Sequence, residues 1–433
     1  MLALILAASF AIRLIAVVPV HSKGMTSDEK EFLLLAHQLI DGRGFVDSNG
    51  DRSVRAPLFP ALVALAMGGF GTPLAQLFVW GCLLGTLVVY LGSLLSLKVW
   101  HDQTVALATA CLLGLYPGLV IYSALLQTET LYIVFFLWAL VLFYQADDRS
   151  ATGTMIALGC AAGLATLTRA VFIGFFPLLL ASLWMMWRKK GKGDLRSLMI
   201  AFGVFCVILA PWTVRNSVVH GAFVPVSTVT GSSLLIGNNP FSHGTPELPP
   251  EYTAWVHARA RDHGIDNIEA LPELERSALM RDIALEYMRS HPMQVVLLAA
   301  RKAFVLWVYP VTQTATDHAI QAVAVGADVV VLLFVAIGLV ASCRHRWRLL
   351  PICSAAVFFT LVQIVMHAEA RYRLPLIPLL GLIGGFGFIV ATRSERRQEA
   401  FSTHGSRVAL GFLLGGIALV YGYTGWLFFH GVV

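Results

Sequence analysis

Charged residues are scarce in this chain: Asp, Glu, Lys and Arg make up 13% of its 433 residues, against about 25% in an average soluble domain. Hydrophobic residues make up 57%, and they gather in repeated runs of helical length. This combination excludes an ordinary soluble domain, and the length of the runs excludes the alternating pattern of a membrane β-barrel. The sequence therefore predicts an all-α polytopic membrane protein.

The chain also lacks a disulfide framework, a zinc-binding spacing, an internal repeat and a low-complexity linker. All six cysteines lie in or at the ends of apolar segments, and none falls in the long polar stretch 216–319. The net charge of +6 comes from cations in short loops between apolar runs, which does not indicate a nucleic-acid partner. The simplest interpretation is one membrane domain covering residues 1–433, with the lipid bilayer as its surroundings.

The apolar runs predict eleven membrane spans. The first is interpreted as a retained span rather than a signal peptide, because it lacks a basic start and Arg13 interrupts it; that arginine should point inward. The predicted spans are 2–20, 73–99, 103–121, 130–146, 152–170, 171–187, 197–213, 320–342, 349–366, 374–392 and 408–430.

Between the spans, residues 21–72 are predicted to be a first extracytoplasmic loop with interfacial helices, one near residues 32–40 and one near 55–71. Residues 216–319 are predicted to be a large extracytoplasmic loop or cap. Within it, Pro272–Arg289 should be a helix and Val295–Tyr309 an interfacial helix.

Loop charge indicates the orientation, because short cytoplasmic loops carry an excess of Lys and Arg. Three basic loops fall on one side of the eleven-span count, and this side is interpreted as cytoplasmic. Their cations are Arg188, Lys189, Lys190, Lys192, Arg196, Arg344, Arg346, Arg348, Arg393, Arg396, Arg397 and Arg407. The other side collects four polar segments: the first loop, 127–129, 216–319 and 367–373.

Asp28 and Glu29 follow the first span, where polar chain begins at the membrane surface. A carboxylate there could take a proton from an acceptor hydroxyl, and Asp28 is the better candidate for this general base. Glu29 should project about 100° away on a helix and face solvent or a cation. The alternative is that Ser27, Asp28 and Glu29 only cap an exposed amphipathic helix.

Glu129 lies in a very short polar turn between two apolar runs, so its carboxylate needs a partner. It is a third candidate for the catalytic group, and the alternative is a carboxylate that only favours a helix start. If Asp28 and Glu129 meet, they could hold a divalent cation or orient an acceptor, but two ligands do not establish a metal site. No other cofactor is indicated.

Several cations could bind an anionic group on the extracytoplasmic side, since arginine forks suit phosphate oxygens. Each taken alone could instead be an anchor that reaches for the membrane surface. The candidate phosphate-binding residues are Arg55, Arg169, Arg215, Arg371, Arg373 and Lys302.

Four further residues are candidates for substrate binding. Asn238 and Asn239 could hydrogen-bond sugar hydroxyls, although an Asn-Asn-Pro sequence is also ordinary turn chemistry, and that explanation is preferred. Tyr372 and His367 belong to the polar segment that carries Arg371 and Arg373.

Taken together, these segments resemble the GT-C glycosyltransferases that use polyprenyl-phosphate sugars, in particular glycosyltransferase families 39 and 83. These families include the protein O-mannosyltransferases and the lipid A aminoarabinose transferase. The residues that carry the resemblance are Ser27-Asp28-Glu29, Arg55–Pro60, Tyr116-Pro117, Gln127-Thr128-Glu129, Thr168-Arg169, Pro211–Asn216, Gly237–Pro240 and Arg371–Pro375. Each is short, but they occur in the family's order.

The resemblance implies a GT-C fold and an inverting transfer from a polyprenyl monophosphate sugar to an acceptor hydroxyl. Asp28 would be the base and arginines would stabilise the leaving phosphate, on the periplasmic side of a bacterial inner membrane. The acceptor could be a glycolipid, a polysaccharide or a protein. The chain departs from larger members of the family in lacking a large soluble C-terminal domain, which leaves the acceptor open.

Two alternatives belong to other classes. An O-antigen ligase or polymerase would use a diphosphate-linked glycan, and its key Arg and His residues would lie in the large loop. A lipid or sugar transporter would carry ionisable groups at mid-bilayer and often inverted repeats.

Overall fold

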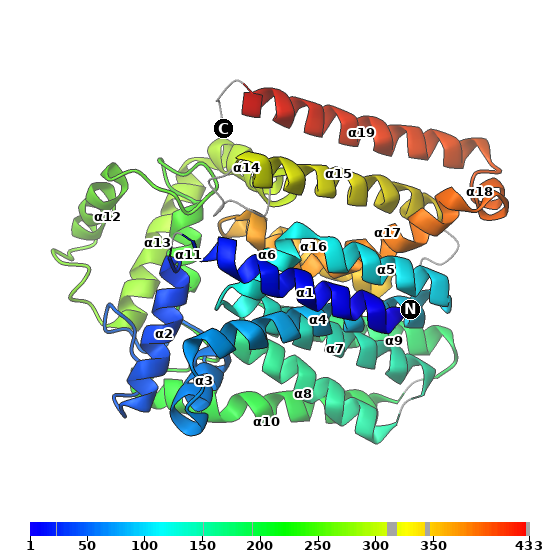
Figure 1. Ribbon diagram of the computed structural model, residues 1–433. Coiled ribbons are helices and arrows are strands. Elements are labelled where there is room, and N and C mark those ends of the chain that lie inside the picture. The colour runs from blue at the N-terminus through cyan, green and yellow to red at the C-terminus, as the bar shows by residue number, and fades with distance from the viewer. Residues whose placement is uncertain (23, 150, 193, 310–317, 343–346, 430–433) are drawn as a thin grey trace.

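The computed structural model describes residues 1–22, 24–149, 151–192, 194–309, 318–342 and 347–429, and it contains no strand among them. Most of the helices run side by side in one bundle (Figure 1). They are α1 (Leu2–Val20), α4 (Leu74–Trp100), α5 (Gln103–Leu115), α6 (Pro117–Ala124), α7 (Thr128–Asp148), α8 (Thr152–Thr168), α9 (Phe172–Lys189), α10 (Leu195–His220), α15 (His318–Ala341), α16 (Leu350–Val365), α17 (Ile377–Thr392) and α19 (His404–Phe429).

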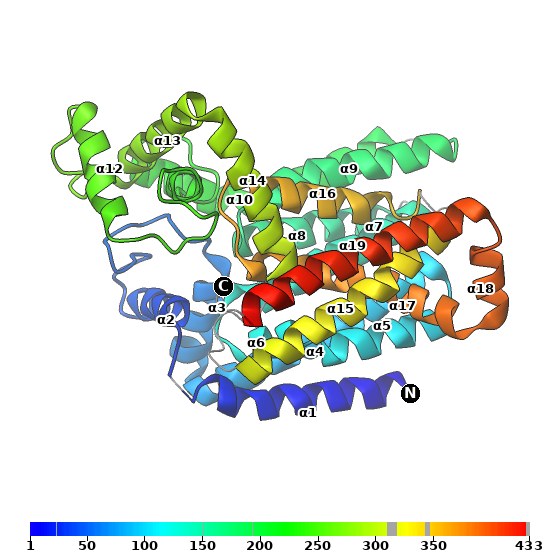
Figure 2. The ribbon, with the colours of Figure 1, turned by 90° about the horizontal axis from the view of Figure 1, so that it is seen from above.

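Shorter elements gather mainly at one end of this bundle, whereas α18 lies at the other end (Figures 1 and 2). They are α2 (Ser27–Ile40), α3 (Leu58–Ala64), η1 (Leu65–Gly69), α11 (Thr230–Gly237), α12 (Glu251–Asp262), α13 (Glu273–Ser290), α14 (Pro292–Val308), η3 (Ala370–Leu376) and α18 (Ser394–Ala400). The first loop therefore contains helices where interfacial helices were expected, α2 and the α3–η1 pair, and their position at the membrane surface stays a prediction. The expected cap helices exist as α13 and α14.

Seven helices in the described residues are long and apolar enough to cross a membrane, or eight when the bent pair α5 and α6 is one span. The two halves of that pair meet at 57°, where Tyr116 precedes Pro117. Each predicted span has a helix or bent pair at its place, so the protein is an integral membrane protein. The count of eleven spans stays a prediction, because α8 and α16 are apolar but short and α9 is not among the helices that qualify.

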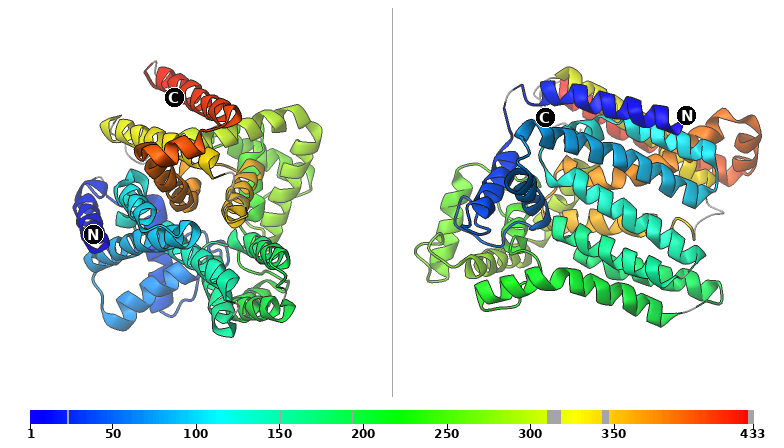
Figure 3. Two further views of the ribbon diagram at one scale, coloured as in Figure 1. Left: turned by 90° about the vertical axis from the view of Figure 1, so that its right-hand side faces the viewer. Right: turned by 60° about the horizontal axis from the view of Figure 1, so that its bottom comes forward.

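The centre of the bundle is α7, whose most apolar stretch of 18 residues is 83% buried. By contrast, the corresponding stretch of α1 is 11% buried and that of α19 is 0% buried, so these two helices lie at the periphery (Figure 3). Aromatic side chains of α7, α9 and α16 interlock at the centre, with Phe136 packing against Phe172, Phe175 and Phe359.

Close approach between α15 and α17 depends on glycine. A Cβ atom on Gly387 would lie 1.9 Å from the carbonyl oxygen of Phe334, and one on Gly338 would lie 2.2 Å from that of Ile383. Small residues at such crossings let the two backbones pack directly. The inward orientation expected for Arg13 is also confirmed: its buried guanidinium donates to the carbonyls of Ser9 and Gly114.

Candidate functional site

The helix α2 begins with a capping box that separates the roles of its two first-turn carboxylates. Thr26 is the N-cap residue, and its side chain accepts from the backbone of Glu29 while the Glu29 carboxylate accepts from the backbone of Thr26. Glu29 is completely buried and also accepts from His21 (3.0 Å) and from the backbone of Leu126 (2.9 Å). Of the two surroundings expected for Glu29, solvent is wrong, because the buried carboxylate ties α2 to the end of α1 and to the α6–α7 turn. A cation is its partner only when His21 is protonated.

Asp28, by contrast, points toward two guanidinium groups. It accepts from Arg55 at 3.0 Å and from Arg371 at 2.5 Å. Burial alone would raise the pKa of Asp28, but the positive charges of Arg371 and Arg55 outweigh it and hold the pKa below its usual range. Asp28 is therefore an ionised carboxylate at neutral pH, and it accepts hydrogen bonds from two cations.

The neighbouring carboxylates are paired in the same way. Glu129, at the start of α7, contacts Arg169 at 2.8 Å. Glu369 accepts from Arg371 (3.0 Å) and from the Tyr372 hydroxyl (3.0 Å). The site thus contains three carboxylates and three guanidinium groups, and every one of the six is engaged in a pair.

A cavity of about 240 Å³ opens beside these pairs, between α2, α7, α11, α16, η3 and the loops at 54–56 and 168–171. Its charged lining residues are Arg55 and Arg169, and His367 and Tyr372 also line it. Burial lowers the pKa of His367 against the opposing pull of Glu369, so this imidazole is neutral near pH 7. Polar walls are completed by Thr128, Thr168, Ser227, Ser233 and Gln363.

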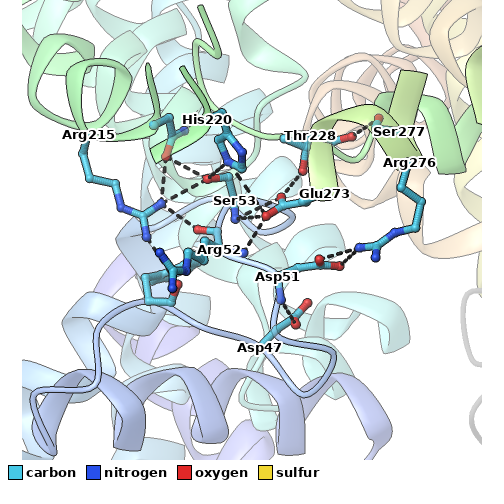
Figure 4. Close-up of polar contacts among 12 residues, drawn as sticks. Asp47, Asp51, Arg52, Ser53, Arg215, His220, Thr228, Glu273, Arg276 and Ser277 are labelled. Carbon is cyan, nitrogen blue, oxygen red and sulfur yellow. Dashed lines mark hydrogen bonds and ion pairs between the residues drawn. The ribbon is translucent and has the colours of Figure 1, made fainter. Parts of the chain in front are cut away.

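The loop that carries Arg55 is held by the cap (Figure 4). Glu273, at the start of α13, accepts from the backbone N–H groups of Arg52 (2.6 Å) and Ser53 (3.1 Å) and from the Thr228 hydroxyl. The backbone of Thr228 donates to the carbonyl of Ser53 at 3.0 Å. These contacts fix the chain two residues before Arg55 and so set where its side chain starts.

Arg215, a predicted phosphate-binding residue, belongs to this network. It donates to the carbonyl of Arg52 (2.7 Å), to the Ser53 hydroxyl (3.0 Å) and to the carbonyl of Phe45 (3.3 Å). Figure 4 shows its side chain directed to the first loop. Its contacts therefore assign Arg215 to holding that loop, and it is not one of the described residues that line the cavity.

Four other predicted residues lie behind the site. Arg373 is buried against Asp328 of α15, with Tyr116 on the other oxygen of that carboxylate. Lys302 is buried and donates to the side-chain oxygen of Asn238 at 3.0 Å. Asn238 and Asn239 donate to carbonyls of α11, as the preferred explanation of turn chemistry predicts. All four side chains have partners within the chain, and a role for them in binding a phosphate or a sugar stays a prediction.

Sequence reasoning missed three carboxylates. Glu369 could have been found, because it lies two residues before Arg371 in the polar segment 367–373. Glu273 carried only a helix-start signal, and Asp328 stands alone in an apolar run, where an acidic residue signals a buried partner. Among the described residues, no group of three or more His, Cys, Asp or Glu side chains is placed to hold a metal ion.

Comparison with known proteins gives a family match over part of the chain. Residues 57–226 match the family described as dolichyl-phosphate-mannose-protein mannosyltransferase. An undecaprenyl phosphate-alpha-4-amino-4-deoxy-L-arabinose arabinosyl transferase 2 of Pseudomonas fluorescens is 29% identical over 35% of this chain. A similar transferase of Pseudomonas paraeruginosa is 26% identical over 47% of this chain. The matches cover 27% and 38% of the lengths of these relatives.

The fold has a counterpart among solved structures. The crystal structure of the Archaeoglobus fulgidus oligosaccharyltransferase, tethered to an acceptor peptide, matches 96% of this chain and 54% of that one. The TM-score is 0.53 and the sequence identity is 14%, so the likeness concerns the fold alone. It confirms the expected all-α GT-C architecture.

Proposed function

From the premise that the chain is a GT-C superfamily protein, similar to protein mannosyltransferases and aminoarabinose transferases, we propose that it is a membrane glycosyltransferase. It moves a sugar from a polyprenyl monophosphate to an acceptor hydroxyl. The supporting comparison is the mannosyltransferase match over residues 57–226, together with relatives named for an undecaprenyl phosphate-linked sugar. The protein would work in a bacterial inner membrane, with its site on the periplasmic side.

The observation that carries the proposal is Asp28, held between Arg55 and Arg371 beside the cavity. In the proposed reaction, Asp28 takes the proton of the acceptor hydroxyl, and the acceptor oxygen attacks the anomeric carbon from the face opposite the phosphate. The configuration at that carbon is inverted. The arginines stabilise the charge that develops on the leaving phosphate.

The size of the cavity favours a donor with a small sugar. Its volume of about 240 Å³ is below the range of roughly 300–1,000 Å³ common for drug-sized ligands. A single sugar ring suits this space better than the glycan of an O-antigen ligase. The charged groups also stand at one end of the bundle, which does not favour a transporter with ionisable groups at mid-bilayer.

The first prediction concerns the base. Asp28→Asn keeps the shape of the side chain but cannot accept the proton, so turnover should fall by about 10²–10⁴-fold. The measurement is release of undecaprenyl monophosphate from undecaprenyl-phosphate sugars by the purified protein in detergent. Glu31→Gln is the matched control, because Glu31 is on the same helix and its carboxylate accepts from the Ser48 hydroxyl. Normal turnover by Asp28→Asn would exclude Asp28 as the base.

A further inference from the structure

The charges of the site balance before any ligand enters. Arg55 and Arg371 each contact the carboxylate of Asp28, and Arg169 contacts that of Glu129. A phosphate that enters the site therefore competes with a carboxylate for a guanidinium. Because a carboxylate and a phosphate can each present two anionic oxygens to the same guanidinium, one group can replace the other as its acceptor.

Asp28 is the carboxylate that is easiest to displace. It accepts hydrogen bonds from Arg55 and Arg371, and its side chain is 20% exposed. Glu129 is 4% exposed and sits on the central helix, and Glu369 keeps a bond from the Tyr372 hydroxyl when Arg371 leaves. A phosphate that takes both arginines of Asp28 leaves the Glu129–Arg169 pair in place.

We propose that Arg55 and Arg371 are shared in turn between the base and the leaving phosphate: they hold Asp28 in the empty site and pass to the phosphate as Asp28 takes up a proton. This inference rests on the proposed function and deepens it. The donor is a phosphodiester with one negative charge, and the product is a phosphate monoester with up to two. The site must supply the additional positive charge at the moment the bond breaks.

The step balances without any further reactant. The acceptor hydroxyl gives its proton to a carboxylate oxygen of Asp28, and its oxygen forms a bond with the anomeric carbon. The bond between that carbon and the phosphate oxygen breaks, and its electron pair stays on the phosphate. One negative charge disappears from Asp28 as one appears on the phosphate, so the total charge of the site is unchanged.

The surroundings of Asp28 fit this exchange. The ionisable groups that act on Asp28 are Arg55 of the first loop, Arg371 of η3, Arg169 after α8, Glu129 of α7 and Tyr122 of α6. Glu369, just before η3, acts on Arg371. The same two arginines that lower the pKa of Asp28 in the empty site would no longer do so once they bind phosphate. Asp28 would thus become a better base as the two arginines pass to the leaving phosphate.

The test is the affinity for undecaprenyl monophosphate, measured with the purified full chain in detergent. Asp28→Asn removes the competing charge, so it should bind this lipid about tenfold more tightly than the natural chain. A residue that acts only as a base, or only as a structural contact, would leave the affinity unchanged or weaken it. Glu31→Gln removes a carboxylate from the same helix without touching the arginines, and its affinity should not change.

Thermal unfolding without ligand shows whether each variant is folded. If Asp28→Asn does not fold, Glu369→Gln provides a second test. It frees Arg371 from one of two carboxylates and should tighten binding by a smaller factor. Equal or weaker binding by the folded variants would overturn the sharing of the arginines while leaving the proposed function in place. If the natural chain itself does not bind the monophosphate, the proposed function fails and this inference fails with it.

Discussion

Lys302 is the residue whose burial has the clearest consequence for stability. Its ammonium group lies behind the site, where it donates to Asn238 and to the carbonyl of Ile364 at 3.1 Å. Burial lowers the pKa of Lys302 from 10.5 to about 8. A lowering of the pKa by this amount means that folding destabilises the charged ammonium, relative to the neutral amine, by roughly 3 kcal/mol.

The sign of the pH dependence follows from proton binding. Between pH 8 and 10.5 the unfolded chain binds more protons at Lys302 than the folded chain, so the contribution of this residue to stability rises as the pH increases. In Lys302→Met this linkage is absent. The Tm of the natural chain should therefore rise relative to the Tm of Lys302→Met when the pH is raised from 7 to 9.5.

The exposed neighbour Arg301 supplies the control, because Arg301→Met changes the charge of the same helix without a buried group. Its Tm difference from the natural chain should stay constant over this pH range. Parallel curves for Lys302→Met and the natural chain would show that the ammonium is not buried as described.

Among the elements, α13 controls the site from a distance. Its first residue, Glu273, holds the backbone of Arg52 and Ser53, whereas Arg276 one turn later contacts Asp51. Glu273→Gln replaces one accepting oxygen by a donor that faces backbone N–H groups. We expect a loss of about 2 kcal/mol in the free energy of unfolding, and weaker binding of undecaprenyl monophosphate because Arg55 is less well placed.

Arg276→Gln is the matched variant, because it removes the contact between α13 and Asp51, the loop residue just before Arg52. It should lower the Tm, measured by thermal unfolding in detergent, with a smaller effect on lipid affinity. If both variants lose stability but neither loses affinity, the contacts of Glu273 hold the cap without positioning Arg55.

At the same scale, the sequence predicts helices better than side-chain partners. The apolar runs place every bundle helix, since burial in lipid requires both length and hydrophobicity. The loop assignments predict that residues near Asp28, Glu129 and Arg371 converge, and the structure brings them together, although their roles stay predictions. Arg371 and Arg373 are two residues apart and face different partners, Asp28 and Asp328. Their spacing alone does not separate a site residue from a buried ion pair.

The whole molecule is polarised along the bundle axis. The cap helices α12 and α13 lie at one end and α18 lies at the other (Figures 1 and 2). Cations gather at the α18 end, where Arg396 pairs with Asp102 and Lys189 packs over the ring of Trp347. Arg344 and Arg346, which also supported the orientation, lie outside the described residues. The excess of positive charge at this end favours the cytoplasm.

This orientation can be tested with two single cysteines at opposite ends, Asp262→Cys on α12 and Ser402→Cys after α18, each in a chain whose native cysteines are replaced by serine or alanine. Both positions are exposed. In intact spheroplasts, a maleimide that cannot cross the membrane should label position 262 and should reach position 402 only after lysis. The opposite pattern would place the cavity in the cytoplasm, away from a lipid-linked donor on the outer face. Labelling of both positions before lysis would contradict the separation of the two ends by a membrane.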